Sequence, residues 1–381
     1  MKSASASDVA EIAKLQHTIS PDSGANIQFS SGTTGKPKAV QVSHFNFVNN
    51  SYYFGKRLQL NEKANRICLQ VPLFHTYGVT LGMMNGLNHG ATLVLPAALH
   101  HPESSLKAIV DEKCNVIFGT PTMFVDLVAK QRELNVKIDH EIDFANTGGS
   151  ICTPKLVKDV LEVLKAKKMK TVYGLTETTA CAFQSRPEDD FEASINTVGY
   201  LGDNIEAKVV DVNGKIVPFG QPGELWVRGY LTMMGYWDEK AKTDEVLDAD
   251  GWFKTGDQFI IHENGYGQVV GRLKEMIIRG GENLFPREIE DFLNTHPNVA
   301  ETHVIGVPDE RMGEEVGAFI RLKDPSKALT REDVKKFCSG SLAHFKIPRY
   351  VVIVKDFPKT LSGKVQKFKF LTEFSEEMKM I

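Results

Sequence analysis

Helix-like and strand-like hydrophobic patterns alternate through the middle of the chain. Residues 105–120 start with SLKAIVDEKC, whose apolar positions share one helical face, and continue into the β-rich run NVIFG. The same order returns at 154–175, where a helical stripe precedes KTVYG and Pro154 stands near the helix start. The stripe consists of Leu156, Val157, Val160, Leu161 and Leu164. This alternation predicts an α/β fold with a mostly parallel sheet.

The pattern changes after residue 195. Two β-rich runs flank Asn213-Gly214 in IEAKVVDVNGKIVPFGQPGELWVRG, which predicts a hairpin within a β-subdomain over about 200–270. From 275 a smaller α+β unit is expected, with strands at AETHVIGV and GEEVGAFIRLK. Helices are expected at PREIEDFLNTHP and at TREDVKKFCSGSL, where Thr330 and Asp333 have the spacing of a helix cap.

Composition narrows the classes of function. A chain of 381 residues is long enough for two or three cores, and a net charge of −3 gives no overall basic field for nucleic acid. The five cysteines are scattered without metal-ligand spacing, which favours free thiols and no structural zinc. No apolar segment approaches the roughly 20 residues of a membrane span. The N-terminus lacks the apolar core of a secretion signal, so a soluble, non-secreted protein is expected.

A glycine- and hydroxyl-rich loop begins close to the start of the chain. It combines flexible backbone, hydroxyl donors and positive charge, which together can wrap a polyphosphate. The residues concerned are Ser30, Ser31, Gly32, Thr33, Thr34, Gly35, Lys36 and Lys38. The spacing is not that of a Walker A loop, and Pro37 would obstruct the helix that follows one. A phosphate loop and an ordinary polar turn both remain open at this point.

Two further turns follow predicted strands. In VYGLTETTA, Tyr173 offers a flat face for a base, Thr176 a hydroxyl, and Glu177 a hard oxygen for Mg²⁺. Taken alone, Glu177 fits a solvated loop carboxylate better than a metal ligand. In TGGS, Gly148 and Gly149 mark either a ligand-lining turn or a plain strand-to-helix connection.

Four more residues have both a chemical and a structural interpretation. Asp257 and Arg272 could bind ribose hydroxyls, or could form a structural salt bridge with each other. Lys364, in KTLSGKVQK, could bring a mobile ammonium to an anion, or could belong to a solvated basic tail. His75, in PLFHTYG, is either a core or pocket-wall histidine or a substrate gate.

Taken together, the order and spacing of SSGTTGKPK, YGLTE, GWFKTGD, GRLKEMIIRGGENLFPREIE and KTLSGKVQK resemble the adenylate-forming enzymes. That superfamily contains acyl-CoA synthetases, beetle luciferases and peptide-synthetase adenylation domains. The resemblance runs from about residue 25 to about residue 370. Within the superfamily, MIIRGGEN, PDERMGEEV and HFKIPRY are most similar to medium-chain fatty acyl-CoA ligases, including a mitochondrial animal form.

The resemblance implies a two-step reaction with ATP, Mg²⁺ and coenzyme A. A carboxylate attacks the α-phosphate of ATP to give acyl-AMP and pyrophosphate, and the thiolate of coenzyme A then displaces AMP. It also implies a large domain over 1–272, a hinge at 273–274 and a small mobile α+β domain over 275–381. A mitochondrial matrix location is implied by the same resemblance, with the cytoplasm as the alternative.

The resemblance also implies a role for each matching residue. The loop from Ser30 to Lys38 would enclose the β- and γ-phosphates. Tyr173 would stack beside adenine, with Gly148 and Gly149 lining that pocket. Thr176 would contact phosphate and Glu177 would help to hold Mg²⁺.

Further along the chain, Asp257 and Arg272 would bind ribose, and Lys364 would reach the α-phosphate. Lys274 matches the hinge, and Gly280 and Gly281 would line a pantetheine passage. His75 matches a position near the acyl and thiol channels. The segments 75–86 and 145–150 would line the acyl pocket, whose apolar side chains would be Phe74, Tyr77, Met83 and Met84.

Two departures from the family pattern qualify this expectation. Ala39 replaces the glycine that normally follows the phosphate-loop lysine. Family members carry about 150–200 more residues, a domain's worth, before this loop, so we expect a large domain that lacks much of its N-terminal subdomain and exposes an apolar face. A weakly active or non-catalytic nucleotide-binding remnant, a ligase for another carboxylate such as an aryl acid, luciferase-like oxidation and carrier-protein loading therefore stay open as alternatives.

Overall fold

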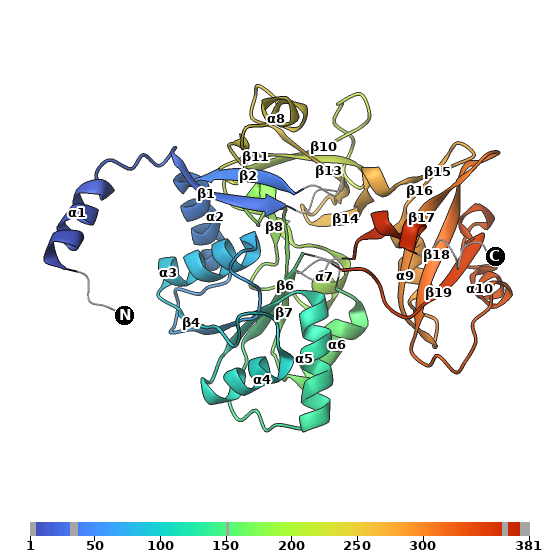
Figure 1. Cartoon of the computed structure of the whole chain (residues 1–381), viewed down its shortest axis with the longest axis horizontal. Coiled ribbons are helices and arrows are strands. Elements are labelled where there is room, and N and C mark those ends of the chain that lie inside the picture. Colours follow the sequence, from blue (N-terminus) through green and yellow to red (C-terminus); the bar gives the residue numbers. More distant parts are fainter. Residues whose placement is uncertain (1–4, 31–36, 150–151, 360–364, 374–381) are drawn as a thin grey trace. The chain divides into compact units, whose positions relative to one another are not determined.

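The computed structural model describes residues 5–30, 37–149, 152–359 and 365–373 (Figure 1). The chain divides into two compact units. The first comprises Met1–Glu206 and Val227–Phe253, and the second comprises Ala207–Trp226 and Lys254–Ile381.

A large sheet of strand order β4-β3-β5-β6-β7-β8-β9 is the centre of the first unit. Its strands are β3 (Arg66–Leu69), β4 (Thr92–Val94), β5 (Val116–Gly119), β6 (Phe144–Gly148), β7 (Met169–Tyr173), β8 (Phe183–Gln184) and β9 (Tyr200–Leu201). The pairs from β4 to β7 are parallel, and β8 and β9 add antiparallel pairs at one edge. The predicted α/β fold with a mostly parallel sheet is confirmed.

Helices cover both faces of this sheet, because neighbouring strand residues point to opposite sides. On one face, Ile117 and Ala145 join a core with α4 (Pro102–Asp111), α5 (Pro121–Leu134) and α6 (Pro154–Val163). On the other face, Phe118 and Val172 join a core with α2 (His44–Arg57) and the π-helix η1 (Tyr77–Met84). The described part of this unit also contains α1 (Ala6–Gln16), α3 (Asn85–His89), α7 (Phe191–Asn196) and α8 (Lys240–Val246).

Three of the helices on the sheet begin in the same way. A residue in extended conformation accepts a hydrogen bond from the third helical N–H, and a proline follows it at the first helical position. The cap–proline pairs are His101-Pro102, Thr120-Pro121 and Thr153-Pro154. The predicted helix start at Pro154 is thereby confirmed.

A small second sheet in the same unit has the order β1-β2-β12. Its strands are β1 (Gly24–Ser30), β2 (Lys38–Ser43) and β12 (Gly235–Tyr236). On β1 the apolar side chains of Ile27 and Phe29 are exposed, whereas the polar side chain of Gln28 is buried. On the neighbouring helix α2, an exposed stripe is formed by Phe45, Val48 and Tyr52.

A four-stranded sheet of order β10-β11-β13-β14 lies largely in the second unit. Its strands are β10 (Ile205–Val210), β11 (Gly223–Gly229), β13 (Phe253–Ile261) and β14 (Gly267–Arg272). The Asn213-Gly214 turn forms as predicted, with Gly214 at φ +77°, and Val210 pairs with Ile216 across it. The strands on either side of it, β10 and β11, are hydrogen-bonded neighbours in this sheet, as the predicted hairpin requires. A second turn, from Pro218 to Gln221, delays the next strand until Gly223.

The rest of the second unit is an α+β fold, as predicted. One sheet has the order β16-β15-β18-β17, with β19 parallel to β18, and its core includes residues from α9 and α10. The elements are η3 (Leu273–Glu275), β15 (Ile277–Arg279), β16 (Glu282–Leu284), α9 (Pro286–Leu293), β17 (Val299–Asp309), β18 (Gly313–Leu322), α10 (Arg331–Cys338), η4 (His344–Lys346), β19 (Tyr350–Val354), η5 (Lys367–Lys369) and α11 (Phe370–Glu373). The predicted cap of α10 is present, since Thr330 and Asp333 exchange hydrogen bonds.

The five cysteines are all free thiols and all buried. Among the described residues, no helix combines the length and apolar character that crossing a membrane requires.

Candidate functional site

Several of the predicted site residues meet at one edge of the large sheet. Because β3, β5, β6 and β7 are parallel, their carboxyl ends lie on the same side. His75 follows β3, Gly148 ends β6 with Gly149 just beyond it, and Tyr173 ends β7 with Glu177 a few residues further on. Open α/β sheets bind ligands at this edge. The sheet topology therefore supports a site there.

Glu177 is the centre of a polar cluster within the first unit. Its Oε1 atom accepts a hydrogen bond from Ser30 Oγ at 3.3 Å and one from the Tyr236 hydroxyl at 3.0 Å. Ser30 ends β1 and pairs directly with Lys38, the first residue of β2. The predicted phosphate loop therefore connects the two strands of a hairpin. Its residues Ser31, Gly32, Thr33, Thr34, Gly35 and Lys36 lie outside the described part of the chain.

Lys38 reaches the same cluster from the other side of the hairpin. Its Nζ atom donates to the Tyr236 hydroxyl at 3.4 Å and lies 4.6 Å from the centre of that ring. Within residues 5–30, 37–149, 152–359 and 365–373, neither Lys38 nor Glu177 has an ion pair with an opposite charge. One cation and one anion are thus held close to each other by neutral groups.

A tight turn after β7 places Glu177. A Cβ at Gly174 would lie 2.1 Å from the carbonyl oxygen of Ala180, so only glycine fits there. Thr179 and Ala180 both adopt positive φ, at 49° and 83°, which is a strained conformation of the kind found at functional sites. The turn is hydrogen-bonded to the segment before β12, since the Met233 N–H donates to the Glu177 carbonyl oxygen at 3.0 Å. Thr176 opens the short 3₁₀ turn η2 (Thr176–Thr178) that carries this carboxylate.

The residues assigned to adenine have clear structural constraints of their own. A Cβ at Gly148 would lie 2.7 Å from the carbonyl oxygen of Val172, and Gly149 adopts φ +87°. Tyr173 is 9% exposed, and its ring packs edge-on against Phe183 at 6.2 Å between centroids. Sheet packing thus explains these residue types by itself, and their contact with adenine stays a prediction.

His75 lies two residues before the start of η1, the π-helix that follows β3. Its Nδ1 atom accepts a hydrogen bond from the Tyr77 N–H at 3.1 Å, so a neutral ring carries its proton on Nε2. The Tyr77 hydroxyl is buried and donates to Asn146 on β6. Burial raises the pKa of Tyr77, which keeps this donor neutral. The Tyr77 hydroxyl therefore links the π-helix by a hydrogen bond to β6, the strand that ends at Gly148.

The four apolar residues assigned to the acyl pocket differ in exposure. Tyr77 is buried, Met83 and Met84 are half-buried, and Phe74 is 55% exposed. π-Helical turns are uncommon and often mark functional sites. The acyl pocket stays a prediction for the segments 75–86 and 145–150, of which 150 lies outside the described residues.

In the second unit, Asp257 and Arg272 face each other across β13 and β14. Arg272 Nε lies 3.1 Å from Asp257 Oδ1, with the carboxylate side chain 4% exposed and the guanidinium side chain 41% exposed. The salt bridge considered from the sequence is therefore present. A paired guanidinium still carries several N–H donors, so ribose binding stays a prediction for this pair.

Gly280 and Gly281 form a two-residue hairpin turn between β15 and β16. Both have positive φ, at 58° and 90°, as a type I′ turn requires. Lys274 is exposed in η3, the 3₁₀ turn between β14 and β15. The turn geometry explains the two glycines structurally, while the pantetheine passage and the hinge stay predictions.

Lys364 lies outside the described residues, but the base of its loop is described. Lys359 and Val365 pair across the loop, and Gln366 N–H donates to the Pro358 carbonyl at 2.8 Å. Just beyond, Lys367 lies 2.7 Å from Glu290 and 3.1 Å from Glu275. The described residues on either side of 360–364 are therefore joined by backbone pairing, and a partly buried ion-pair network follows them in the chain.

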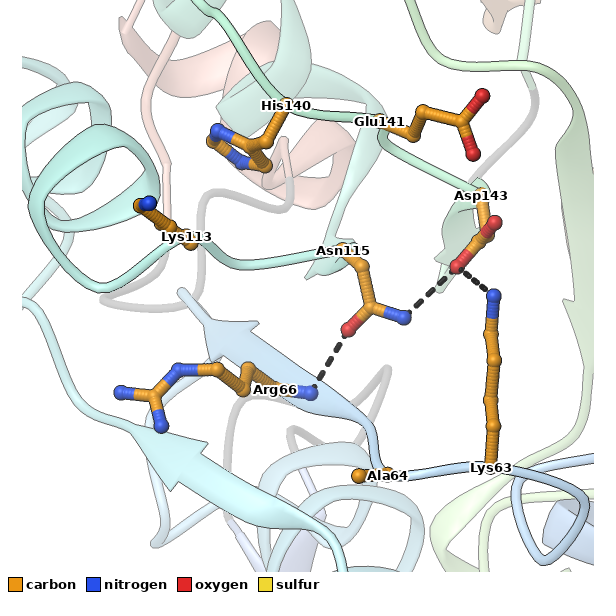
Figure 2. Close-up of a pocket in the computed structure, with 8 residues that line it drawn as sticks. All are labelled: Lys63, Ala64, Arg66, Lys113, Asn115, His140, Glu141 and Asp143. Carbon is orange, nitrogen blue, oxygen red and sulfur yellow. Dashed lines mark hydrogen bonds and ion pairs between the residues drawn. The ribbon is translucent and has the colours of Figure 1, made fainter.

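A surface pocket of about 290 Å³ lies at the opposite, amino-terminal edge of the large sheet. Figure 2 shows its polar lining, in which Asn115 bridges the starts of three strands. Asn115 Oδ1 accepts from the Arg66 N–H at 2.8 Å, and Nδ2 donates to Asp143 at 2.7 Å. Burial opposes ionisation of Asp143, but its bonds to Lys63 and Asn115 keep its pKa below the usual value. These groups satisfy one another, which indicates a structural role.

Replacing Asn115 with alanine should therefore destabilise the first unit without impairing the site at the other edge. The substitution leaves the Arg66 N–H without its acceptor and the Asp143 carboxylate without one of its donors. This should lower the free energy of unfolding by about 1–3 kcal/mol. Chemical denaturation of the two proteins measures this difference. Glu141→Gln, a change at an exposed lining residue, serves as the matched control and should leave stability nearly unchanged. An Asn115→Ala protein as stable as the parent would contradict the structural role.

The arrangement suits a ligand that combines metal and phosphate. Among the described residues, no cluster of three or more metal-binding side chains occurs. A single carboxylate that has no ion-paired cation among the described residues fits Mg²⁺, which takes one or two protein ligands and completes its shell with phosphate and water. Glu177 would hold such an ion. The Lys38 ammonium, with only neutral partners described, would in turn attract phosphate oxygens.

Comparison with known proteins places the chain in a family. The profile described as AMP-binding enzyme matches residues 2–237, and that of the AMP-binding enzyme C-terminal domain matches residues 288–364. The chain belongs to the AMP-binding enzyme family, which confirms the resemblance found in its motifs.

Particular relatives agree with this assignment. The zebrafish "Medium-chain acyl-CoA ligase ACSF2, mitochondrial" is 44% identical over 97% of this chain and 61% of its own length. ATP-bound MatB from Rhodopseudomonas palustris has a TM-score of 0.85 and 29% identity, covering 94% of this chain and 69% of that one. O-succinylbenzoate CoA synthetase from Bacillus subtilis, with its acyl-adenylate intermediate, has a TM-score of 0.80 and 27% identity, covering 92% and 70%. The chain thus spans about three fifths of the length of the curated relative.

Two residues, one in each unit, could not be singled out from the sequence. Tyr236 contacts residues 59 and 198 positions away, and its only local signal is an aromatic residue after a glycine in MMGYW. Lys367 was one of several lysines in a basic segment, and only the fold shows that its side chain is 18% exposed between two glutamates.

Proposed function

We propose that this chain is an ATP-dependent acyl-CoA ligase for a fatty, medium-chain carboxylate. The single observation that carries the proposal is the cluster of Ser30, Lys38 and Glu177, in which neither the ammonium nor the carboxylate is ion-paired with any described residue. Membership of the family and the name of the zebrafish relative support the acyl-CoA ligase activity. ATP and an acyl-adenylate in the two structural relatives support the intermediate.

In the first half-reaction, a carboxylate oxygen attacks the α-phosphorus of ATP. The bond to the bridging oxygen breaks, which releases pyrophosphate and leaves acyl-AMP. The β- and γ-phosphates would lie against the Ser30–Lys38 loop, and Lys364 would approach the α-phosphate as charge develops. Mg²⁺, when bound, would neutralise phosphate charge beside Glu177. Positioning and charge neutralisation supply most of the catalysis of phosphate transfer reactions.

In the second half-reaction, the thiolate of coenzyme A attacks the acyl carbonyl carbon. AMP leaves with the electron pair of the acyl–oxygen bond, and an acyl thioester remains. His75 would lie near the acyl and thiol channels, with its Nε2 proton as a hydrogen-bond donor. Tyr173, Gly148 and Gly149 would form the adenine site. Asp257 and Arg272 would bind the ribose of the nucleotide.

A functional boundary at Leu273–Lys274 would separate a large domain over 1–272 from a small domain over 275–381. Rotation there would exchange the Lys364 loop for the Gly280–Gly281 hairpin between the two half-reactions. The position of η3 supports this assignment, because it is a short connector between β14 and β15 and hinge residues are usually loop or element-terminal positions.

Lys274→Pro should slow thioester formation more than adenylation. Proline fixes φ near −65° and restricts the residue before it, so the rotation is blocked while a helical turn is still allowed. Single-turnover rates for each half-reaction measure the effect, with Lys274→Ala as the control that removes the side chain but leaves the backbone free. Equal slowing of both half-reactions would count against a hinge at this residue.

The substrate is tested with a panel of C4 to C16 acids, ATP and coenzyme A. Acyl-CoA formation detected by mass spectrometry should be largest for medium-chain acids. Products from aryl acids instead would reassign the substrate, and ATP binding without any product would favour a nucleotide-binding role.

The relative's name also supports a mitochondrial location, which imaging of the tagged native gene product would test.

A further inference from the structure

The hydroxyl of Tyr236 lies between the two charged residues of the candidate phosphate and metal site. It donates to Glu177 Oε1 at 3.0 Å and accepts a hydrogen bond from Lys38 Nζ at 3.4 Å. The same ammonium lies 4.6 Å from the centre of the Tyr236 ring, a distance at which the ring face attracts a cation. One neutral side chain therefore contacts both charged groups.

The backbone around Tyr236 fixes the position of this hydroxyl. β12 pairs antiparallel with β2, which sets Tyr236 opposite Val40. The Tyr236 N–H donates to Thr243 Oγ1 on α8 at 2.9 Å. Gly235 adopts φ +148°, and a Cβ there would lie 2.9 Å from the Thr243 side chain. With strand pairing on one side and α8 on the other, the ring has a defined place at 6% exposure.

The hydroxyl remains neutral under ordinary conditions. Burial, and the nearby charge of Glu177, raise the pKa of Tyr236 well above its usual value. A neutral phenol can donate to a carboxylate and accept from an ammonium at the same time. Without such a group between them, a carboxylate and an ammonium this close would attract each other and pair directly.

We propose that Tyr236 is a positioning residue that keeps Lys38 and Glu177 apart, so that Lys38 stays available for phosphate and Glu177 for Mg²⁺. This inference rests on the proposed function and adds a residue to its site. Without the hydroxyl, Lys38 and Glu177 can form an ion pair with each other. This ion pair competes with phosphate for Lys38 and with Mg²⁺ for Glu177.

The test compares ATP binding with Mg²⁺ and with EDTA, by equilibrium dialysis of labelled ATP against the full chain. The quantity of interest is the gain in ATP affinity that Mg²⁺ provides. Tyr236→Phe keeps the ring, and it should reduce this gain by about ten- to a hundredfold, the effect of one hydrogen bond to a charged group. Tyr230→Phe removes a hydroxyl from another buried tyrosine, which stacks on Tyr53, and should keep the full gain.

A rescue experiment separates positioning from a general structural effect. Lys38→Gln removes the cation that would collapse onto Glu177, so the Tyr236→Phe change should have little further effect on the Mg²⁺ gain in that background. A merely structural role would lower ATP affinity equally with Mg²⁺ and with EDTA, and would persist in the Lys38→Gln protein. Either result, or an unchanged Mg²⁺ gain in Tyr236→Phe, would overturn the inference while the proposed function stands. A parent chain that binds no ATP would overturn both.

Discussion

Replacing Lys364 with alanine is expected to slow acyl-adenylate formation by roughly a hundredfold to a thousandfold, the usual effect of removing one charge-stabilising donor from a transition state. The attacked phosphorus is surrounded by anionic oxygens, and Lys364 would supply the ammonium nearest to the developing charge. Thioester formation from supplied acyl-AMP should be spared, because that step breaks a bond to the acyl carbon. Rapid-quench measurement of the rate of each half-reaction tests whether adenylation is slowed and thioester formation is spared.

The control for this variant comes from the other end of the same loop. Lys359→Ala removes an equal charge from the residue that pairs with Val365 and should leave adenylation close to normal. Equal losses in both half-reactions of Lys364→Ala would refute the assignment of Lys364 to adenylation.

Glu177→Gln should remove most of the Mg²⁺ dependence and lower the adenylation rate by about a hundredfold or more. The amide keeps an oxygen that can accept from Ser30 and Tyr236, so the cluster should keep its shape while it loses the charge that attracts the metal. ATP affinity in EDTA should stay close to that of the parent protein. Titration of the adenylation rate with Mg²⁺ is the measurement.

Glu192→Gln, on the exposed surface of α7, is the matched control and should leave the Mg²⁺ titration unchanged. If Glu177→Gln kept the parent's Mg²⁺ dependence, the metal would have to be bound elsewhere.

Much of the fold could be predicted because burial follows the hydrophobic pattern in the parallel sheet. The stripe that includes Leu156, Val157 and Val160 is buried in α6, and β7 follows where KTVYG predicts a strand. The pattern fails at β1, where Ile27 and Phe29 are exposed and Gln28 is buried, because the polar neighbour Asn26 satisfies that amide.

The candidate site was partly accessible to sequence reasoning. Motif spacing singled out Glu177 and the Ser30–Lys38 loop, and the fold brings the described ends of that loop to the carboxylate. Tyr236 was missed because its role depends on contacts between distant segments, which no local pattern encodes. The π-helical geometry of η1 was also missed, since its apolar sequence does not differ from that of an ordinary buried helix.

The exchange of labelled pyrophosphate into ATP tests the central claim most directly, because it reports reversible acyl-adenylate formation. The account predicts exchange that requires both a medium-chain acid and Mg²⁺, and that falls sharply in Glu177→Gln and Lys364→Ala. An absence of exchange with every acid of the panel, in a folded chain that binds ATP, would contradict it.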